Sequence, residues 1–261
     1  MLAGWVLRRY LEAAPGGPAG ADAAYRARGF FSASTVSSKF LSRLAAAEGC
    51  SYVETLTGFK WMGNAMAGAQ AAGQTPLFAF EEAIGYACCS AVRDKDGVSA
   101  AALVGEMVGV LAGEGLSCAG WLAQLFRTYG ACCSNNGYVI VRQPRVTAGI
   151  FERLIAGGHY WARCGPLAVV GVRDLKAPGW DSSAPGGAPT LPLSSSSNML
   201  TYTFANGVTA TLRSSGTEPK LKWYAEGPSA AVVDSTVDCI LAEMLQPEAN
   251  GLARPPRVVR E

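Results

Sequence analysis

A turn near the C-terminus concentrates side chains that suit an anionic ligand. It reads TLRSSGTEPKLK and contains one arginine, several hydroxyls, a glycine and two lysines. A guanidinium offers phosphate oxygens a planar fork of donors, and a glycine turn can aim backbone N–H groups at the same anion. A solvated turn is the alternative, because Ser, Gly and Pro are also ordinary turn formers. The candidate ligands are Arg213, Ser215, Gly216, Thr217 and either Lys220 or Lys222.

Two adjacent carboxylates follow an apolar run in the segment LFAFEEAIGY. Glu81 and Glu82 come at the C-terminal end of this predicted strand, the edge at which open α/β sheets bind ligands. A carboxylate there can accept hydrogen bonds from two neighbouring sugar hydroxyls. Acids at a helix start or in an exposed turn are the alternative interpretation.

Two further loops carry candidate residues. In RDKDGVSAA, two alternating acids precede a glycine, and no further ligand follows at the spacing of a calcium loop. Asp96 is therefore predicted to cap the following helix, and Lys95 to lie at a helix start, where a bound anion is favoured. The segment ETLTGFKWMG predicts a strand-to-helix turn through Thr57 and Gly58.

Alternating strands and helices must position these loops in the first half of the chain. An amphipathic helix over residues 2–11 is expected to end at Pro15 and lead into a loop. Strands are then predicted over residues 30–36, 52–56 and 76–80, and helices over 37–47, 62–72, 97–111 and 121–129. The alternation predicts a parallel, layered α/β domain over residues 1–129.

After residue 130 the predicted strands come in pairs. Asn206-Gly207 is a strong hairpin signal. The remaining strands are expected over residues 138–142, 167–172 and 220–226, and helices over 147–155 and 230–245. This pattern predicts an α+β domain over residues 130–261, with a flexible loop at 176–197 and a tail at 247–261.

Bulk composition narrows the function classes. The chain has 261 residues and a formal net charge of +2, which gives no electrostatic reason to expect a nucleic-acid or membrane partner. Eight cysteines without a C-x-x-C pair, and a single histidine, predict no metal site and fit thiols in a reducing compartment, the cytoplasm. A transit peptide is the alternative for the N-terminus, although Glu12 and Asp22 interrupt that pattern.

Taken together and in this order, the four loops resemble the C-terminal half of the α-D-phosphohexomutase superfamily. TLTGFKWMGNAM, FAFEEAIGYACC, DKDGVSAA, TFANGVTATLRSSGTEPK and WYAE are similar to its phosphoglucomutase-2 branch, which comprises phosphopentomutase and glucose-1,6-bisphosphate synthase. The likeness runs from about residue 2 to beyond residue 245. It implies a truncated third domain, a three-layer α/β unit that begins at its first helix, followed by the family's α+β fourth domain.

The resemblance also implies roles for individual residues. The family's sugar-reading loop falls on Glu81, Glu82 and Ala83, where many relatives carry a serine in place of the alanine. Its lysine near the reacting end falls on Lys95, in a supporting catalytic role, and its third-domain turn on Thr57 and Gly58. Its phosphate clamp falls on the following residues: Arg213, Ser215, Gly216, Thr217 and Lys222.

Two catalytic parts of the family are not found in this sequence. It has neither an S-H-N-P-like loop, which would carry the transferable phosphate, nor a D-x-D-x-D-R-like loop, which would hold magnesium. In the family both parts belong to the first two domains. The serine-rich run SSSSN, residues 194–198, is interpreted as a linker.

The resemblance therefore implies a phosphosugar mutase that uses magnesium and a glucose 1,6-bisphosphate-type intermediate. This chain is expected to bind the sugar phosphate and to be inactive without the family's N-terminal domains. A fragment of a glucose-1,6-bisphosphate synthase and a noncatalytic phosphosugar-binding or interaction module are the alternatives.

Overall fold

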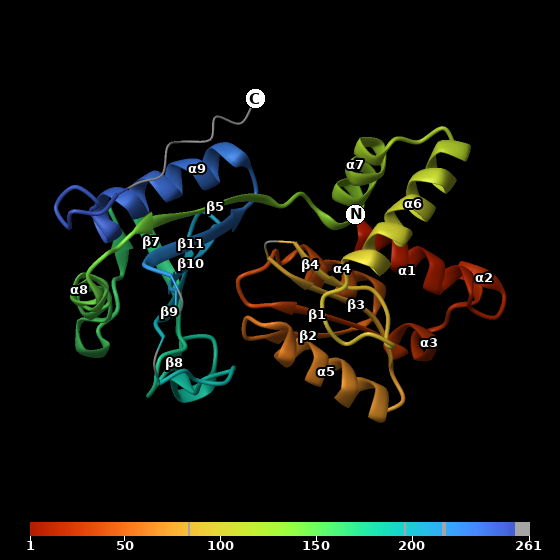
Figure 1. Cartoon of the computed structure of the whole chain (residues 1–261), viewed down its shortest axis with the longest axis horizontal. Coiled ribbons are helices and arrows are strands. Elements are labelled where there is room, and N and C mark those ends of the chain that lie inside the picture. Colours follow the sequence, from red (N-terminus) through yellow and green to blue (C-terminus); the bar gives the residue numbers. More distant parts are fainter. Residues whose placement is uncertain (83, 196, 216–217, 254–261) are drawn as a thin grey trace. The chain divides into compact units, whose positions relative to one another are not determined.

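The chain folds into two compact units that divide after Cys132 (Figure 1). The computed structural model describes residues 1–82, 84–195, 197–215 and 218–253. Each unit contains its own sheet and its own buried cluster of apolar side chains.

The first unit is built on a four-stranded sheet with the order β2-β1-β3-β4. The strands are β1 (Gly29–Ser34), β2 (Ser51–Thr55), β3 (Thr75–Glu81) and β4 (Gly85–Ala87). β1 pairs in parallel with β2 and β3, which confirms the predicted parallel layer. β4 runs antiparallel to β3, because the short link between them allows a hairpin and not a crossover.

Helices cover both faces of this sheet. The helices of this unit are α1 (Leu2–Glu12), α2 (Gly17–Gly20), α3 (Ala23–Arg28), α4 (Phe40–Glu48), α5 (Phe59–Ala71), α6 (Gly97–Gly113) and α7 (Cys118–Tyr129). Successive residues of buried β1 point to opposite faces: Phe30 packs in the cluster of α5, and Phe31 in the cluster of α4. The predicted layered α/β architecture is confirmed.

Two local predictions for the first unit were wrong. The segment after Pro15, predicted to be a loop, contains α2, and Asp22 then caps α3 by accepting a hydrogen bond from the Tyr25 N–H at 2.7 Å. The helix predicted to begin at residue 37 begins at Phe40, because Ser37 is engaged elsewhere.

The second unit contains an antiparallel sheet with the order β5-β11-β10-β9-β7-β6, to which β8 adds by pairing with β7. The strands are β5 (Cys133–Ile140), β6 (Arg163–Cys164), β7 (Leu167–Asp174), β8 (Trp180–Asp181), β9 (Met199–Phe204), β10 (Thr209–Ser214) and β11 (Lys220–Gly227). The predicted β9–β10 hairpin is confirmed, and Gly207 adopts the left-handed conformation (φ 84°) that the turn requires.

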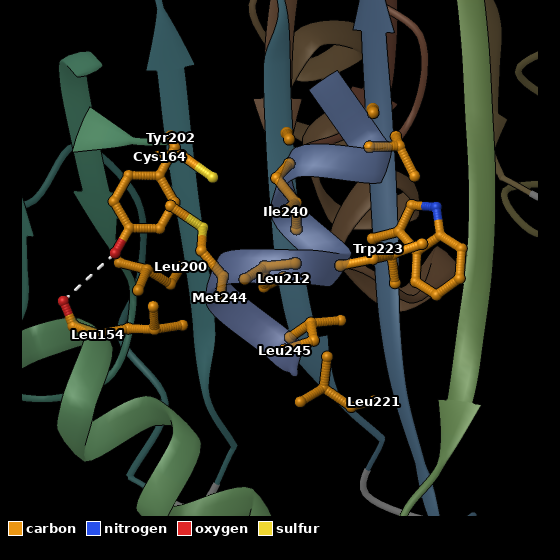
Figure 2. Close-up of a cluster of buried hydrophobic side chains, with 14 of the residues drawn as sticks. Leu154, Cys164, Leu200, Tyr202, Leu212, Leu221, Trp223, Ile240, Met244 and Leu245 are labelled. Carbon is orange, nitrogen blue, oxygen red and sulfur yellow. Dashed lines mark hydrogen bonds between the residues drawn. The ribbon is translucent and has the colours of Figure 1, made fainter. Parts of the chain in front are cut away.

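Helices pack on one face of this second sheet. They are α8 (Pro144–Ile155), α9 (Ala230–Cys239) and a π-helix, η3 (Ile240–Leu245). Two 3-10 turns, η1 (Ala156–Gly158) and η2 (Pro185–Gly187), complete the helical elements described in this unit. Figure 2 shows Leu212 and Leu221 of the sheet facing Met244 and Leu245 of the π-helix. Because side chains alternate along a strand, the neighbours of Leu212 project from the opposite face of the sheet.

The segment 176–197 contains regular structure. β8 and η2 lie within it, and the buried Asp181 carboxylate accepts hydrogen bonds from the Ser183 N–H at 2.9 Å and the Ser183 hydroxyl at 2.6 Å. A third hydrogen bond comes from the Thr190 hydroxyl. The flexibility expected of this segment stays a prediction.

Helix length and hydropathy bear on membrane crossing. Within the described ranges, no single helix is long and apolar enough to span a bilayer, and α6 with α7 meets the criterion only as a pair bent by 91°.

Candidate functional site

The N-terminus of α5 joins two of the predicted site loops in the first unit. The Gly58 N–H donates a hydrogen bond to Glu81 Oε1 at 2.5 Å. Gly58 is the N-cap of α5 and has a φ of 107°, a conformation that residues with a Cβ rarely adopt. A carboxylate is stabilised at a helix N-terminus by unpaired N–H groups and the helix dipole. The turn and the strand end are thus held together by Glu81.

Lys95 also lies near the N-terminus of α5, where its ammonium group is close to the ring of Phe59, the first residue of that helix. Its Nζ lies 5.8 Å from the centroid of the Phe59 ring and 3.2 Å from Asp94 Oδ1, and its side chain is 66% exposed. A Cβ at Gly85 would lie 2.6 Å from that ring, so the β3–β4 hairpin also packs against it. The structure therefore brings Gly58, Glu81 and Lys95 around one aromatic side chain.

The loop that carries Lys95 is fixed by its two acids. Asp96 accepts a hydrogen bond from the Val98 N–H at 2.9 Å, which confirms its predicted role as the helix cap, and its own N–H donates to the Tyr86 carbonyl at 2.8 Å. The backbone N–H of Lys95, followed by its ammonium, lowers the pKa of Asp94. Lys95 is therefore presented to solvent from an anchored loop.

Glu82 is supported by a serine that sequence reasoning assigned elsewhere. The Glu82 N–H donates a hydrogen bond to Ser37 Oγ at 2.8 Å, and Ser37 Oγ lies 2.7 Å from Ser34 Oγ. The sequence predicts either Ser37 or Ser38 as the cap of α4, and it is Ser38 Oγ that accepts a hydrogen bond from the Phe40 N–H, at 3.1 Å. The signal for the role of Ser37 is weak, because Ser37 and Glu82 are 45 positions apart in the chain. Ala83 lies outside the described residues.

In the second unit, two cationic residues of the predicted clamp face each other across a strand pair. Arg213 of β10 is directly opposite Lys222 of β11, on the face of the sheet that Leu212 does not use. Like charges at such positions repel each other. Arg213 Nε is buried and has no hydrogen-bond partner among the described residues. A buried donor without a partner destabilises the folded state. An anion bound here would accept a hydrogen bond from this donor and would also reduce the repulsion between the two cations.

Glu218 supplies a carboxylate beside this pair, and sequence reasoning missed it. Its Oε2 lies 3.3 Å from Lys222 Nζ, and its Oε1 lies 2.8 Å from Lys220 Nζ. Hydrogen bonds from Lys220 and then Lys222 lower the pKa of Glu218. Lys220 Nζ also lies 4.4 Å from the centroid of the Tyr138 ring. Of the two lysines, Lys222 is the one that pairs in register with Arg213.

The turn between β10 and β11 is closed by short-range bonds. The Ser215 N–H donates to the Lys220 carbonyl at 3.0 Å, and Ser215 Oγ accepts from the Glu218 N–H at 3.2 Å. Asn198, the last residue of the serine-rich run, exchanges hydrogen bonds with Ser214 at 3.0 and 3.1 Å. That run therefore leads directly to the base of the turn. Gly216 and Thr217 lie outside the described residues.

A bound metal ion needs several convergent ligands. Across the described ranges, no three His, Cys, Asp or Glu side chains come together as a metal site would require. Asp94 is bonded to Lys95, and Asp96 caps α6. Because both acids are engaged in this way, they do not fit a magnesium site.

Two sequence models of one protein family match the chain. The model described as phosphoglucomutase/phosphomannomutase, alpha/beta/alpha domain III, covers residues 21–129. The model described as phosphoglucomutase/phosphomannomutase, C-terminal domain, covers residues 170–243. The two matches fall in different compact units, in the order in which the sequence resemblance placed them.

Similar proteins include two human enzymes. Glucose 1,6-bisphosphate synthase is 41% identical over 233 residues, which cover 84% of this chain and 37% of the synthase. Phosphopentomutase is 47% identical over 196 residues, which cover 74% of this chain and 32% of that enzyme. The chain thus spans about a third of the length of these relatives.

A solved structure supports the fold. The Paramecium protein pp63/parafusin, described as a phosphoglucomutase in its open form, matches 98% of this chain and 43% of its own length, with a TM-score of 0.63. Sequence identity is 14%, so this match bears on the fold alone.

Proposed function

The chain belongs to the phosphoglucomutase/phosphomannomutase family, and on that premise we propose that its two units bind a phosphorylated sugar for a phosphosugar mutase. The proposed reaction interconverts the 1-phosphate and the 5- or 6-phosphate of a pentose or hexose through a bisphosphate. This chain would orient the sugar and hold the phosphate that is not being transferred.

The observation that carries the proposal is the state of Arg213. Its buried Nε has no partner among the described residues, and it stands opposite a second cation, Lys222. A phosphate dianion satisfies both features, because its oxygens accept charge-assisted hydrogen bonds and neutralise the pair. Ser215, with Gly216 and Thr217 beside it in the sequence, would add hydroxyl and N–H donors to the same anion.

The sugar-orienting part of the proposal uses the first unit. Glu81 and Glu82 would accept hydrogen bonds from sugar hydroxyls, next to the turn at Thr57 and Gly58. The exposed ammonium of Lys95 would stabilise negative charge near the reacting end of the sugar. In these roles the residues bind and orient, and Lys95 alone comes close to the chemistry.

Phosphoryl transfer itself is assigned to no residue of this chain. The sequence resemblance implies that a phosphoserine would supply the phosphate and that magnesium would neutralise charge on the moving group. The 261 residues contain neither of the two sequence patterns expected for those parts. The eight free cysteines fit a reducing compartment, and we place the protein in the cytoplasm on that ground.

Glucose-1,6-bisphosphate synthesis is the second candidate. It is favoured by the longer match to the human synthase, 233 residues against 196 for the human phosphopentomutase. The mutase and the synthase would use the same phosphate clamp and would differ in the sugar whose hydroxyls Glu81 and Glu82 bind.

The test is ligand-dependent thermal stabilisation of the intact chain. Glucose 1-phosphate, ribose 1-phosphate and glucose 1,6-bisphosphate should each raise Tm, since a ligand at a hundred times its Kd stabilises by about 2.7 kcal/mol. Neutral glucose and ribose are the ligand controls. The order of the phosphorylated sugars separates the two candidates.

The matched variants are Arg213→Ala and Arg145→Ala, the latter on the exposed side of α8. Arg213→Ala should abolish the ligand-dependent rise, and Arg145→Ala should retain it. An undiminished rise in Arg213→Ala would remove the clamp assignment.

A further inference from the structure

Two free cysteines from distant parts of the chain lie side by side in the second unit. The Sγ atoms of Cys164 and Cys239 are 3.3 Å apart, although the residues are separated by 75 positions. The Cys239 thiol also donates a hydrogen bond to the Cys164 carbonyl oxygen at 2.9 Å. Two thiols this close can become bonded by rotation of their side chains and a small shift of the backbone.

The backbone around the pair is shaped for this approach. Cys164 is the last residue of β6 and lies in the buried cluster beside Tyr202 (Figure 2). Cys239 is the last residue of α9, just before the π-helix. A Cβ at Gly165 would lie 3.0 Å from the Cys239 sulfur, and Gly165 adopts a left-handed conformation (φ 51°). Glycine therefore leaves room for the second thiol.

We propose that Cys164 and Cys239 form a redox modification site that a peroxide converts into an intrachain disulfide. Hydrogen peroxide first oxidises Cys239 to a sulfenic acid, and its O–O bond breaks with release of one water. The Cys164 thiol then attacks the Cys239 sulfur, so that the S–S bond forms, the S–O bond breaks and a second water leaves. Two thiols and one peroxide thus give one disulfide and two waters.

The difference in burial between the two thiols determines which one is oxidised first. Cys239 is partly exposed, whereas Cys164 has no exposed surface. Burial, and then the contact with Cys239, raise the pKa of the Cys164 thiol, which keeps it protonated and poorly reactive toward peroxide. Peroxide therefore meets Cys239, and Cys164 acts as the resolving thiol.

The disulfide would close a loop that contains the candidate phosphate turn. The segment between the cysteines includes β7 to β11 and Arg213. Cross-linking a loop of this length restricts the unfolded chain and should raise the Tm of the second unit by about 5 °C or more. This inference stands apart from the proposed function, because it needs no sugar phosphate.

The direct test is peptide mapping of the intact chain after treatment with hydrogen peroxide. Residual thiols are alkylated, the protein is digested without reductant, and the peptides are identified by mass spectrometry. We expect a cross-linked peptide pair containing Cys164 and Cys239, the rise in Tm, and reversal of both by dithiothreitol. Recovery of Cys164 as an alkylated free thiol, or linked to another cysteine, would overturn the proposal.

Two variants localise the effect. Cys239→Ser should lose the cross-link and the rise in Tm, while Cys118→Ser, at the start of α7, should keep both. Cys239 is partly exposed, so this serine is expected to be tolerated in the fold. A full peroxide-induced rise in Cys239→Ser would contradict the assignment.

Discussion

Three charged side chains lie close together in the β10–β11 region of the second sheet: Arg213, Lys222 and Glu218. The two cations are opposite each other in register, and the Glu218 carboxylate lies 3.3 Å from Lys222 Nζ. Since Arg213 Nε has no partner among the described residues, the carboxylate neutralises the lysine side only. A phosphate bound between the cations would have to compete with Glu218 for Lys222.

Replacement of Glu218 tests this competition. Glu218→Gln should tighten glucose 1-phosphate binding about two- to fivefold, since the exposed carboxylate would no longer compete with the phosphate for Lys222. Calorimetric titration measures the change, and Glu152→Gln on the exposed side of α8 is the control. Weaker binding in Glu218→Gln would instead mean that the carboxylate positions Lys222 for the ligand.

Asp174, also in the second unit, predicts a pH dependence of stability. It is 5% exposed, and burial raises its pKa against the opposing hydrogen bonds from the Lys176 N–H and the Tyr160 hydroxyl. A carboxyl whose folded pKa is raised stabilises the fold fully below its unfolded pKa of about 3.9, and this contribution is lost as the pH rises through the folded pKa.

Asp174→Asn should remove that dependence. The variant should gain in free energy of unfolding relative to the wild type as the pH rises from about 4 toward neutrality, because only the wild type then buries a charge. Urea unfolding across this pH range measures the difference. A difference that stays constant, or that shrinks as the pH rises, would contradict the assignment.

At the scale of elements, α5 organises the site in the first unit. Its N-terminus gives the Gly58 N–H to Glu81, and its first side chain, Phe59, receives Lys95. Its Gly63 allows the Arg93 carbonyl to approach, because a Cβ there would lie 2.4 Å from that oxygen. The helix therefore sets the position of the loop that carries Lys95.

Substitution of two glycines of α5 distinguishes the effect of this packing on stability from the effect of helix propensity. Gly63→Ala should destabilise the protein by about 1–3 kcal/mol, because backbone must move away from the new methyl group. Gly68→Ala should stabilise by about 0.5–1 kcal/mol, since a Cβ there would meet no other segment of the described structure within 4 Å. Denaturant unfolding compares the two. Stabilisation by both substitutions would show that the loop does not pack against Gly63.

Local signals in the sequence predicted many of the helices, strands and turns. Strand and helix alternation, the Asn206-Gly207 hairpin and the Asp96 cap all depend on neighbouring residues, and each is confirmed. β6 and β8 have two residues each, too few to show a period of two. The π-helix was predicted as a continuation of α9, because a short apolar run does not distinguish the two helical periods.

Contacts between distant segments could not be predicted. Ser37 supports Glu82 across 45 positions, and no local pattern announces that bond. For Glu218, the sequence shows two lysines nearby but not the direction of their side chains. The phosphate clamp could be proposed from the sequence because its candidate residues lie close together in the chain, from Arg213 to Lys222.

At the scale of the whole molecule, the chain consists of two units with separate cores. Separate cores predict separate stability, because each unit buries its own apolar surface. Each unit positions its own candidate residues by local contacts: Glu81 by α5 in the first unit, and Arg213 by the β10–β11 pair in the second. Damage to one core should therefore leave the candidate residues of the other unit ordered.

Leu212→Ala tests this independence. Leu212 is fully buried, so its truncation should cost the second unit about 2–5 kcal/mol. Hydrogen exchange measured by mass spectrometry should show faster exchange in β9, β10 and β11 and unchanged exchange in β1 and β3. Equal loss of protection in both sheets would show that the units unfold together.

The most direct test of the central claim is an NMR titration of the intact, isotopically labelled chain with glucose 1-phosphate. The phosphate clamp predicts saturable shifts of the Ser214, Ser215 and Lys222 amide signals, which neutral glucose does not cause and which Arg213→Ala abolishes. Shifts confined to other parts of the chain, or a response of these three amides that survives in Arg213→Ala, would contradict it.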